Sequence, residues 1–258
     1  MKILYIAGYG RSGSSIVSRL LGASEGVLSL GEFGRFANHV KLNASCSCGL
    51  ELNRCPVWSP IIRKGIHRPL EAILDASESN QYKVVIDSSK TAYYDFWRPL
   101  YYIIKGQNVK VLHLVRAPEK VLSSTIKGRN KDLERNIYRK RRFEFARTLI
   151  GWIFANFAAS AYRLRFRRGG YLKVRYEEFI ETPSVCLKKI EALIDHSFSF
   201  SESLVSNGTA IPAGHEIAGN RALRDEEVFF VSRPRENLDK ERRKIAWSFF
   251  NIIFKPIS

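Results

Sequence analysis

A loop rich in glycine and serine follows the first apolar run of the chain and has the composition of a phosphate-binding loop. It runs from Gly8 to Ser15 and reads GYGRSGSS. Backbone N–H groups of such a loop, together with a helix N-terminus, attract an anion, and hydroxyl groups add further donors. The spacing from Gly8 to Gly13 is that of a Walker A loop, but Ser14 stands where that loop has its lysine. The cation is Arg11 instead, so the loop predicts phosphate binding without the lysine contact that a nucleoside triphosphatase needs.

An arginine at the end of a later apolar run predicts a second anion site. Val109–Val115 is typical of a buried strand, and Arg116, Pro118 and Ser124 follow it. A guanidinium and a hydroxyl near the start of a helix can form a phosphate site. The alternative is a surface arginine followed by a serine on a helix face, and it does not explain why a phosphate loop accompanies this segment.

These two segments together resemble the sulfotransferases that depend on 3′-phosphoadenosine 5′-phosphosulfate (PAPS). In the tyrosylprotein and many bacterial members, a loop with arginine inside it binds the 5′-phosphosulfate. The family's 3′-phosphate motif is a strand that ends in Arg, with Pro two residues later and Ser eight residues after the Arg. The resemblance implies a P-loop-like α/β fold, with three α/β/α layers around a central parallel sheet. It also implies transfer of a sulfuryl group from PAPS to a hydroxyl acceptor.

Two further segments resemble the parts of the family that carry out the reaction. A Gly-Glu pair ending at Glu32 resembles the segment that carries the general base in the tyrosylprotein branch. Lys90 ends a segment similar to one in bacterial members and would meet the transferred sulfuryl group. The resemblance thus implies Arg11, Glu32 and Lys90 as catalytic residues. The better-known cytosolic enzymes have a catalytic histidine after their second core strand and this chain does not, so His215 and Asp87 remain alternatives for the base.

The remaining matches concern the nucleotide. Val174–Phe179 looks like the family's Tyr-Glu-Asp segment, whose tyrosine lies near the adenine, and His215–Arg221 resembles a loop that closes over the nucleotide. The implied cofactor-binding residues are Gly10, Arg11, Ser12, Gly13, Ser14, Ser15, Arg116, Ser124, Tyr176, Asn220 and Arg221. We therefore expect PAPS as co-substrate and no requirement for a metal.

Three cysteines cluster in a segment that is also rich in glycine and proline. They are Cys46, Cys48 and Cys55, and together with His39 or His67 they could hold a zinc ion. However, Cys-x-Cys is not the usual Cys-x₂-Cys knuckle. The spacing therefore favours a loop on the substrate side with free thiols, and no metal site is predicted.

The elements that must position these residues are short strands alternating with helices. Four apolar runs have strand character: Lys2–Ala7, Lys83–Asp87, Val109–Val115 and Tyr171–Arg175. Such alternation predicts a parallel sheet covered by helices on both faces. The length of 258 residues suits one α/β domain. We expect a single sulfotransferase domain over residues 1–258, with a cysteine-containing insertion around residues 43–60.

The charge of the chain indicates an anionic partner without choosing it. Lysine plus arginine number 42 and aspartate plus glutamate 25, for a net charge of +17. Such a field attracts nucleic acid, anionic membrane or a doubly phosphorylated nucleotide. The basic run Arg139–Arg142 lacks a pattern of stacking aromatics, so we expect no nucleic-acid partner, and peripheral contact with an anionic membrane stays open. The apolar run at the N-terminus is too short for a signal peptide or a membrane span, which favours a cytoplasmic protein.

Two other functional classes fit the sequence less well than the transferase. A catalytically inactive P-loop-like protein could bind a nucleotide or an anionic lipid, but it need not keep Arg11 together with Arg116 and Ser124. A small-molecule kinase is disfavoured by Ser14 at the position of the Walker lysine. For the transferase, the hydroxyl acceptor can be a carbohydrate, a lipid, a peptide tyrosine or a small phenol.

Overall fold

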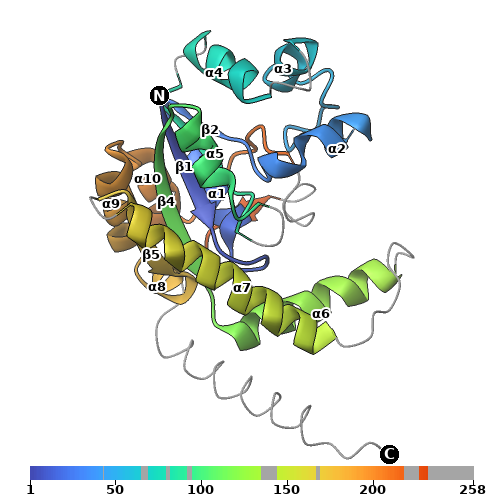
Figure 1. Ribbon diagram of the computed structural model, residues 1–258, viewed down its shortest axis with the longest axis vertical. Helices are drawn as coiled ribbons and strands as arrows, with labels where there is room; N and C mark the ends of the chain where they lie inside the picture. The colour runs from blue at the N-terminus through green and yellow to red at the C-terminus, as the bar shows by residue number, and fades with distance from the viewer. Residues whose placement is uncertain are drawn as a thin grey trace, which may run out of the picture.

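A five-stranded parallel sheet in the order β2-β3-β1-β4-β5 forms the centre of the computed structural model (Figure 1). The structure describes residues 1–42, 44–64, 69–79, 82–91, 95–134, 144–166, 169–217 and 227–231. The strands of the sheet are β1 (Lys2–Ala7), β2 (Val27–Ser29), β3 (Val84–Asp87), β4 (Asn108–Val115) and β5 (Tyr171–Arg175). All of their pairings are parallel.

The strands predicted from the apolar runs are confirmed to within one residue at each end. β2 is the exception, because its three residues are too few to show a periodic pattern. It pairs with β3, with Val27 opposite Val84 and Ser29 opposite Ile86, and so lies at one edge of the sheet.

Helices connect the strands and follow the last of them. They are α1 (Ser14–Gly22), the 3₁₀ helix η1 (Phe33–Arg35), α2 (Phe36–Lys41), α3 (Trp58–Lys64), α4 (Pro69–Ser79), α5 (Arg98–Ile104), α6 (Pro118–Glu134), α7 (Glu144–Arg165), α8 (Tyr176–Glu181), α9 (Pro183–Ile194) and α10 (Ser199–Asn207). A small antiparallel pair, β6 (Ala210–Ile211) and β7 (Val228–Phe229), lies outside the main sheet. Proline begins α6 and α9, where its missing N–H costs the helix no hydrogen bond.

Alternation along β1 divides the core between the two faces of the sheet. Leu4 and Ile6 belong to a buried cluster with α1, α8, α9 and α10. Ile3 and Tyr5 belong to another with α4, α5 and α7. Because neighbouring residues of a strand point to opposite faces, the sheet has helices on both sides, as Figure 1 shows. The prediction of three α/β/α layers is confirmed.

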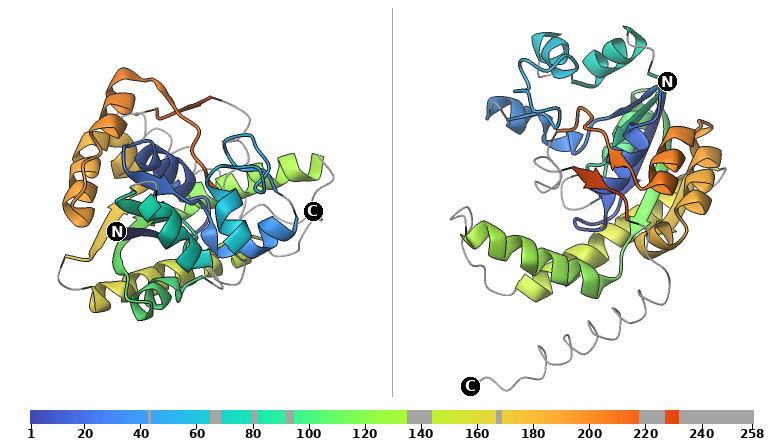
Figure 2. Two further views of the ribbon diagram at one scale, coloured as in Figure 1. Left: turned by 90° about the horizontal axis from the view of Figure 1, so that it is seen from above. Right: turned by 180° about the vertical axis from the view of Figure 1, so that it is seen from behind.

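The cysteine segment packs at the β2 edge of the sheet. From residue 44 to residue 57 it consists of turns and one isolated bridge, and α3 begins at Trp58. The Trp58 ring is fully buried and lies 5.5 Å from the Phe36 ring and 6.4 Å from the Phe33 ring, measured between centroids. Figure 2 shows this region beside the segment that carries β6. The expected irregular segment thus has a small apolar core of its own.

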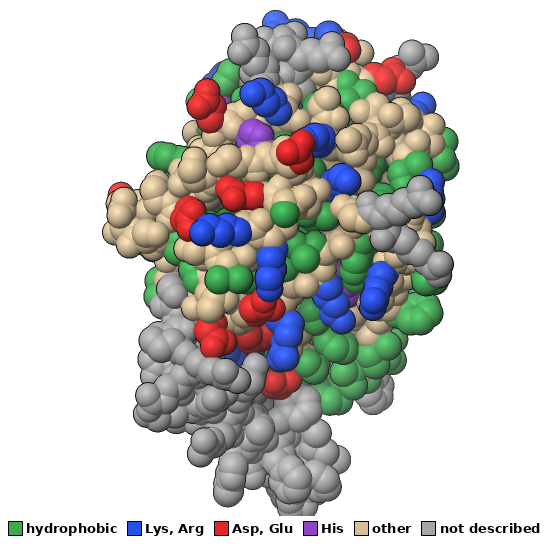
Figure 3. All heavy atoms as spheres, turned by 90° about the vertical axis from the view of Figure 1, so that its left-hand side faces the viewer, with side chains coloured by type: hydrophobic (Ala, Val, Ile, Leu, Met, Phe, Trp, Pro, Cys, Tyr) green, Lys and Arg blue, Asp and Glu red, His purple; other side chains and the backbone are tan. Residues whose placement is uncertain are grey.

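The surface in Figure 3 carries basic and acidic side chains side by side, so this face is not a uniform positive patch. None of the helices in the described ranges is both long and apolar enough to cross a membrane.

A buried carboxylate anchors the end of β3. Asp87 is fully buried. Its Oδ2 accepts a 2.5 Å hydrogen bond from the hydroxyl of Tyr102 and lies 3.3 Å from the Arg98 Nε. Its Oδ1 accepts a 2.8 Å hydrogen bond from the backbone N–H of Ser89. Burial and the charge of Asp87 raise the pKa of Tyr102 well above its usual value, so Tyr102 stays a hydrogen-bond donor.

We predict that Asp87→Asn destabilises the fold, because it leaves the partly buried Arg98 without its principal counter-charge and replaces one acceptor oxygen by a donor. The free energy of unfolding should fall by about 3–5 kcal/mol, measured by urea denaturation. Asp75→Asn is the control: Asp75 pairs with Lys64 at the surface, at 2.8 Å. Its loss should stay below about 1 kcal/mol. Equal effects in the two variants would contradict a structural role for Asp87.

Candidate active site

The glycine loop leaves the carboxyl end of β1 and is held from both neighbouring strands. Gly8 has a φ of 130°, and a Cβ there would lie 2.4 Å from the carbonyl oxygen of Leu114 in β4. Thr91, after β3, accepts a 3.1 Å hydrogen bond from the Gly8 N–H on its Oγ1 and donates its own N–H to the Gly8 oxygen at 3.0 Å. Only glycine permits this approach, so the beginning of the loop is fixed between β3 and β4.

The loop keeps donors available for an anion. Ser12 is 1% exposed, and its hydroxyl has no hydrogen-bond partner within the described ranges. Gly13, with a φ of 90°, is the N-cap of α1, and no side chain of the described residues caps the helix there. The first N–H groups of a helix have no partner inside it. A phosphate fits this loop, since it would satisfy both the buried hydroxyl and the helix N-terminus.

Arg116 extends the site from the end of β4 to the loop. Its Nη1 donates a 3.0 Å hydrogen bond to the carbonyl oxygen of Arg11, and its guanidinium lies 4.9 Å from the centre of the Tyr176 ring. Its Nε is buried without a hydrogen-bond partner among the described residues. The Tyr176 ring in turn lies against Gly13, where a Cβ would come within 2.2 Å of it. The structure therefore brings Gly13, Arg116 and Tyr176 together, and the Arg116 guanidinium keeps a donor for an anion.

Two residues that the sequence analysis did not assign hold this arginine in place. Trp152 of α7 donates from its Nε1 to the carbonyl oxygen of Arg116 at 3.0 Å. Glu177, which is 3% exposed, accepts the Ala117 N–H at 3.1 Å. The sequence motif could have identified Glu177, because this residue directly follows Tyr176. No sequence motif pointed to Trp152, since it belongs to a helix far along the chain from Arg116.

The side chain of Arg11 lies along α6. A Cβ on Gly128 would come within 2.6 Å of the Arg11 Nη2, so the guanidinium lies against that point of the helix. Ser124 is four residues before Gly128, and residues spaced by four share one helix face. Ser124 thus lies on the side of α6 that meets the phosphate loop.

Glu32 and Lys90 form an ion pair after β2 and β3. Their side chains are 14% and 13% exposed, and the Lys90 ammonium contacts Glu32 Oε1 directly. The Arg35 Nε lies 3.4 Å from the other carboxylate oxygen. Burial alone would raise the pKa of Glu32, but Lys90, Arg35 and His39 together hold it below its usual value. The carboxylate is therefore ionised and able to accept a proton, and the nearby Lys90 ammonium lowers its pKa.

Two of the predicted catalytic cations have an unusual backbone. Within the described ranges, Arg11 (φ 67°), Lys90 (φ 71°) and Asp195 (φ 50°) are the non-glycine residues with positive φ. A side chain in this region costs free energy and is maintained by its surroundings, most often at functional sites. The hydroxyl of Tyr5 contacts the Lys90 carbonyl oxygen and contributes to holding that turn.

The alternatives for the general base have other partners. Asp87 is enclosed by Tyr102, Arg98 and Ser89, as described above. The His215 Nδ1 lies 3.2 Å from the Cys55 Sγ, inside the cysteine segment. Both alternatives are thus engaged in other contacts, and Glu32 stays the predicted base. Asn220 and Arg221, also predicted to bind the nucleotide, lie outside the described residues.

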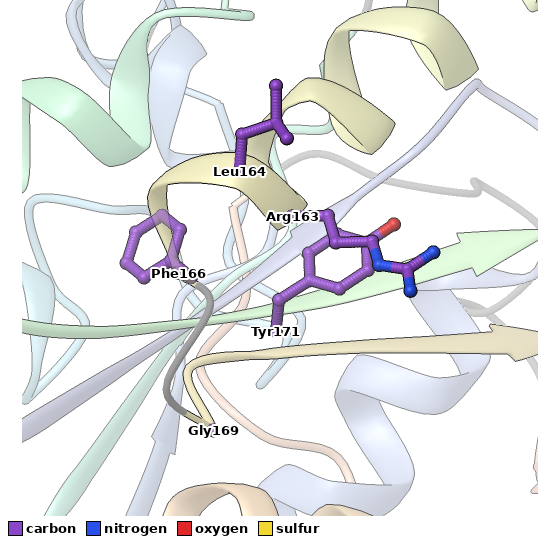
Figure 4. Close-up of a pocket in the computed structure, with 5 residues that line it drawn as sticks. All are labelled: Arg163, Leu164, Phe166, Gly169 and Tyr171. Atoms are coloured by element: carbon purple, nitrogen blue, oxygen red, sulfur yellow. The ribbon is translucent and has the colours of Figure 1, made fainter.

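A hollow of about 640 Å³ lies away from these residues (Figure 4). It is lined by Arg163, Leu164, Phe166, Gly169 and Tyr171. Tyr171 is the first residue of β5, so the hollow is at the amino end of that strand. The phosphate loop, Lys90 and Arg116 all follow the carboxyl ends of strands, where ligands of open parallel sheets bind. The hollow is therefore at the wrong end of the sheet to be the candidate active site, although it is large.

The family model of the sulfotransferase domain matches residues 2–210. The chain belongs to the sulfotransferase family. This match contains both segments that are predicted to bind phosphate, Glu32 and Lys90, and it ends before His215. As a sulfotransferase, the protein transfers a sulfuryl group, and PAPS is the donor that this family uses.

Solved sulfotransferase structures share the fold. The chain is similar to the sulfotransferase domain from the curacin biosynthetic pathway, with a TM-score of 0.58, 15% identity, and coverage of 94% of this chain and 90% of that one. The sulfotransferase domain of the Synechococcus PCC 7002 olefin synthase gives 0.52, 19% identity, and coverage of 88% and 81%. A sulfotransferase from Mycobacterium tuberculosis H37Rv gives 0.50, 12% identity, and coverage of 78% and 70%. No curated protein matches the sequence.

We predict that Gly13→Ala lowers the melting temperature of the sulfotransferase, while Gly10→Ala changes it little. Alanine at position 13 must adopt a left-handed conformation, which costs about 1–2 kcal/mol, and must also displace the Tyr176 ring. A Cβ on Gly10 meets no atom of the described part of the chain within 4 Å. Thermal unfolding followed by circular dichroism compares the two variants with the wild type. Similar melting temperatures for both variants would mean that the ring does not pack on Gly13.

Proposed function

We propose that this sulfotransferase binds PAPS along the carboxyl edge of its sheet and transfers the sulfuryl group to a hydroxyl acceptor, with Glu32 as general base. The observation that carries the proposal is the contact between the two segments that are predicted to bind anions. Arg116, after β4, is hydrogen-bonded to the backbone of the glycine loop after β1, at Arg11. One rigid edge thus presents two sets of donors, as a nucleotide with phosphates at both ends of its ribose requires.

The donor set divides between the two ends of the nucleotide. The loop residues Gly10, Ser12, Gly13, Ser14 and Ser15 would hold the 5′-phosphosulfate through N–H and hydroxyl groups. Arg116 and Ser124 would hold the 3′-phosphate, with Tyr176 beside the adenine. Asn220 and Arg221 remain predicted contacts from the C-terminal side.

The Glu32–Lys90 pair supports a specific order of events. In the free enzyme the positive charge of Lys90 lowers the pKa of Glu32, so the ionised carboxylate is a weak base. A sulfuryl group bound beside the loop would attract the Lys90 ammonium to its non-bridging oxygens. Without that cation the pKa of Glu32 would rise, because burial would then be opposed only by Arg35 and His39, and the carboxylate would become a stronger base for the acceptor proton. Arrival of the donor would thus activate the base.

The leaving group acquires negative charge as the bond from its oxygen to sulfur breaks. Arg11 and the loop N–H groups would stabilise this charge, because donors that are already oriented need no rearrangement during the reaction. The acceptor oxygen has to approach in line with the leaving oxygen. No contact among the described residues favours the catalytically inactive alternative. The acceptor class, a peripheral membrane contact and a cytoplasmic location stay predictions from the sequence.

Replacing Arg116 by alanine tests the 3′-phosphate assignment. Affinity for adenosine 3′,5′-bisphosphate should fall about 10- to 100-fold, since hydrogen bonds to a charged group are lost. Affinity for adenosine 5′-monophosphate, which lacks the 3′-phosphate, should change little. Isothermal titration calorimetry gives both values, and Arg63→Ala on the exposed side of α3 is the control. If the two ligands weaken alike, Arg116 supports the loop instead of binding the 3′-phosphate.

Replacing Glu32 by glutamine tests the base. Turnover should fall by about two orders of magnitude or more, while PAPS affinity is kept, because the amide cannot accept the proton. Mass spectrometry of pooled hydroxyl acceptors for a gain of one sulfuryl group measures turnover. Glu25→Gln, at an exposed position, is the control. Loss of PAPS binding together with turnover would assign Glu32 a structural role.

The pH profile of the wild type provides a second readout. The acid limb of kcat/KM reports the free enzyme, where Lys90 depresses the pKa of Glu32, so it should lie below the usual range of a glutamate. The acid limb of kcat reports the complex, where Lys90 has turned to the sulfuryl group, and it should lie at higher pH. Identical limbs would contradict activation by the donor.

A further inference from the structure

Four potential metal ligands meet between the cysteine segment and the residues that precede Ile217. They are Cys46, Cys48, Cys55 and His215, and their ligand atoms all lie within 4.8 Å of one another. Cys46 is 2% exposed and Cys55 is fully buried. The proposed sulfuryl transfer uses none of these side chains, so the cluster requires an explanation of its own.

Four of the distances between these atoms are close to those of ligands around one tetrahedral ion. Zinc binds thiolate sulfur at about 2.3 Å and imidazole nitrogen at about 2.0–2.1 Å, which places two sulfurs about 3.8 Å apart and a sulfur and a nitrogen about 3.5 Å apart. The Cys55 Sγ lies 3.7 Å from that of Cys46 and 3.9 Å from that of Cys48. The His215 Nδ1 lies 3.2 Å from the Cys55 sulfur and 4.0 Å from the Cys46 sulfur. One ion at the centre would satisfy all four.

Other uses of three thiols fit less well. A disulfide requires sulfurs about 2.05 Å apart and would leave one of the three cysteines over. An iron–sulfur cluster spreads its ligands over several metal atoms, whereas these four converge on one point. Soft thiolates with one imidazole, in a tetrahedral arrangement, are the ligand set that zinc takes in structural sites.

The backbone is shaped to present the first two thiols. The Cys46 N–H donates to the Leu50 carbonyl oxygen at 2.8 Å, and the Gly49 N–H donates to the Cys46 oxygen at 3.1 Å. Gly49 has a φ of 88°, which closes the turn in a conformation that favours glycine. This tight turn holds the sulfurs of Cys46 and Cys48 on the same side as Cys55.

The histidine is held by the same segment. The Trp58 Nε1 donates to the His215 carbonyl oxygen at 2.7 Å. The Ser47 N–H donates to the Glu216 oxygen at 3.1 Å, and the Glu216 N–H donates back to the Ser47 Oγ at 2.7 Å. The backbone on and after His215 is therefore fixed independently of the thiols. These hydrogen bonds keep the imidazole ring directed at the sulfurs.

We propose that Cys46, Cys48 and Cys55, through their Sγ atoms, and His215, through Nδ1, bind a structural zinc ion. Four protein ligands complete the tetrahedron and leave no open position for a substrate, so the ion would take no part in sulfuryl transfer. Its role is to cross-link the cysteine segment to a part of the chain that is 160 residues away in sequence.

This cross-link leads directly to the proposed base. Ile217, two residues after His215, donates its N–H to the Leu30 oxygen and accepts the N–H of Glu32, both at 2.9 Å. Gly31 and Ile217 form an isolated parallel bridge. An ion that fixes His215 therefore also fixes the backbone that positions Glu32, and its loss would loosen that bridge.

The fold supplies the fourth ligand that the spacing of the cysteines in the sequence did not reveal. Cys-x-Cys alone is not a zinc knuckle, and neither His39 nor His67 is the fourth ligand in this group. His39 is outside it, and His67 is not among the described residues. His215, which the sequence suggested as a rival base, supplies the missing ligand because the segment after β6 returns to the cysteine turn.

Metal content of the purified full-length protein tests the proposal. Inductively coupled plasma mass spectrometry should find about one zinc ion per chain after growth with zinc. Titration of the thiols with a mercurial should release that zinc, as followed with a colorimetric chelator. After exchange into cobalt(II), the visible spectrum should show tetrahedral bands and sulfur-to-cobalt charge transfer. Iron in place of zinc, or metal-free protein whose thiols all react freely, would overturn the assignment.

Variants separate the site from adventitious binding. Cys46→Ser and His215→Ala should lose the metal, whereas His215→Cys, which supplies a fourth thiolate, should keep it. Cys186→Ser is the matched control, since Cys186 is a buried free thiol in another core cluster and should leave the zinc content unchanged. Equal zinc in Cys46→Ser and Cys186→Ser would refute the site. The experiments on wild-type protein hold even if a ligand variant fails to fold.

Hydrogen exchange tests the structural consequence. Removing the metal from the wild type with a strong chelator should speed exchange of the Glu32 and Ile217 amides and lower the melting temperature. The Lys2–Ala7 amides in the central strand should keep their protection. Unchanged exchange at Glu32 in the metal-free protein would show that the ion does not support the bridge.

Discussion

Parallel pairing of β1 with both β3 and β4 is the constraint on which the site depends. It aligns Tyr5 with Asp87 on one side and with Val111 on the other, so three strands end at the same edge of the sheet. The glycine loop, Lys90 and Arg116 each follow one of these ends. Short contacts then join them across the edge: the Thr91 N–H to the Gly8 oxygen, the Tyr5 hydroxyl to the Lys90 oxygen, and Arg116 to the Arg11 oxygen. The edge is rigid because it is hydrogen-bonded from strand to strand.

Two carboxylates near this edge have different tasks because their surroundings differ. Asp87 is fully buried and enclosed by several donors, so it can stabilise the turn after β3 but cannot reach an acceptor. Glu32 is partly exposed, and its main partner is Lys90, a flexible cation that a sulfuryl group can attract. Burial and charge act in opposite directions on the pKa of Glu32. In the proposed mechanism, a base balanced in this way responds to the arrival of the donor.

At the β2 edge, segments that are distant in sequence hold the backbone of the proposed base, Glu32. The small core around Trp58 anchors the cysteine segment, and that segment holds the backbone of His215 and Glu216. The next residue, Ile217, then pairs with the Leu30–Glu32 stretch after β2. The short irregular cysteine segment buries little apolar surface. A structural ion at this point would add the free energy of metal binding to the stability of the segment. The position of the proposed base thus depends on a part of the chain that is far from it in sequence.

The sequence by itself determined the layered fold and the family, and it singled out the two segments proposed to bind phosphate, because each depends on residues close together along the chain. Apolar runs, a glycine loop and an arginine that ends a strand are local patterns. β2 was missed because three residues carry no period. Only the tertiary structure decided which distant side chains meet: Glu32 with Lys90, 58 residues apart, and His215 with Cys55, 160 apart. The physical reason is that sheet register and core packing set such contacts, and no local spacing encodes them.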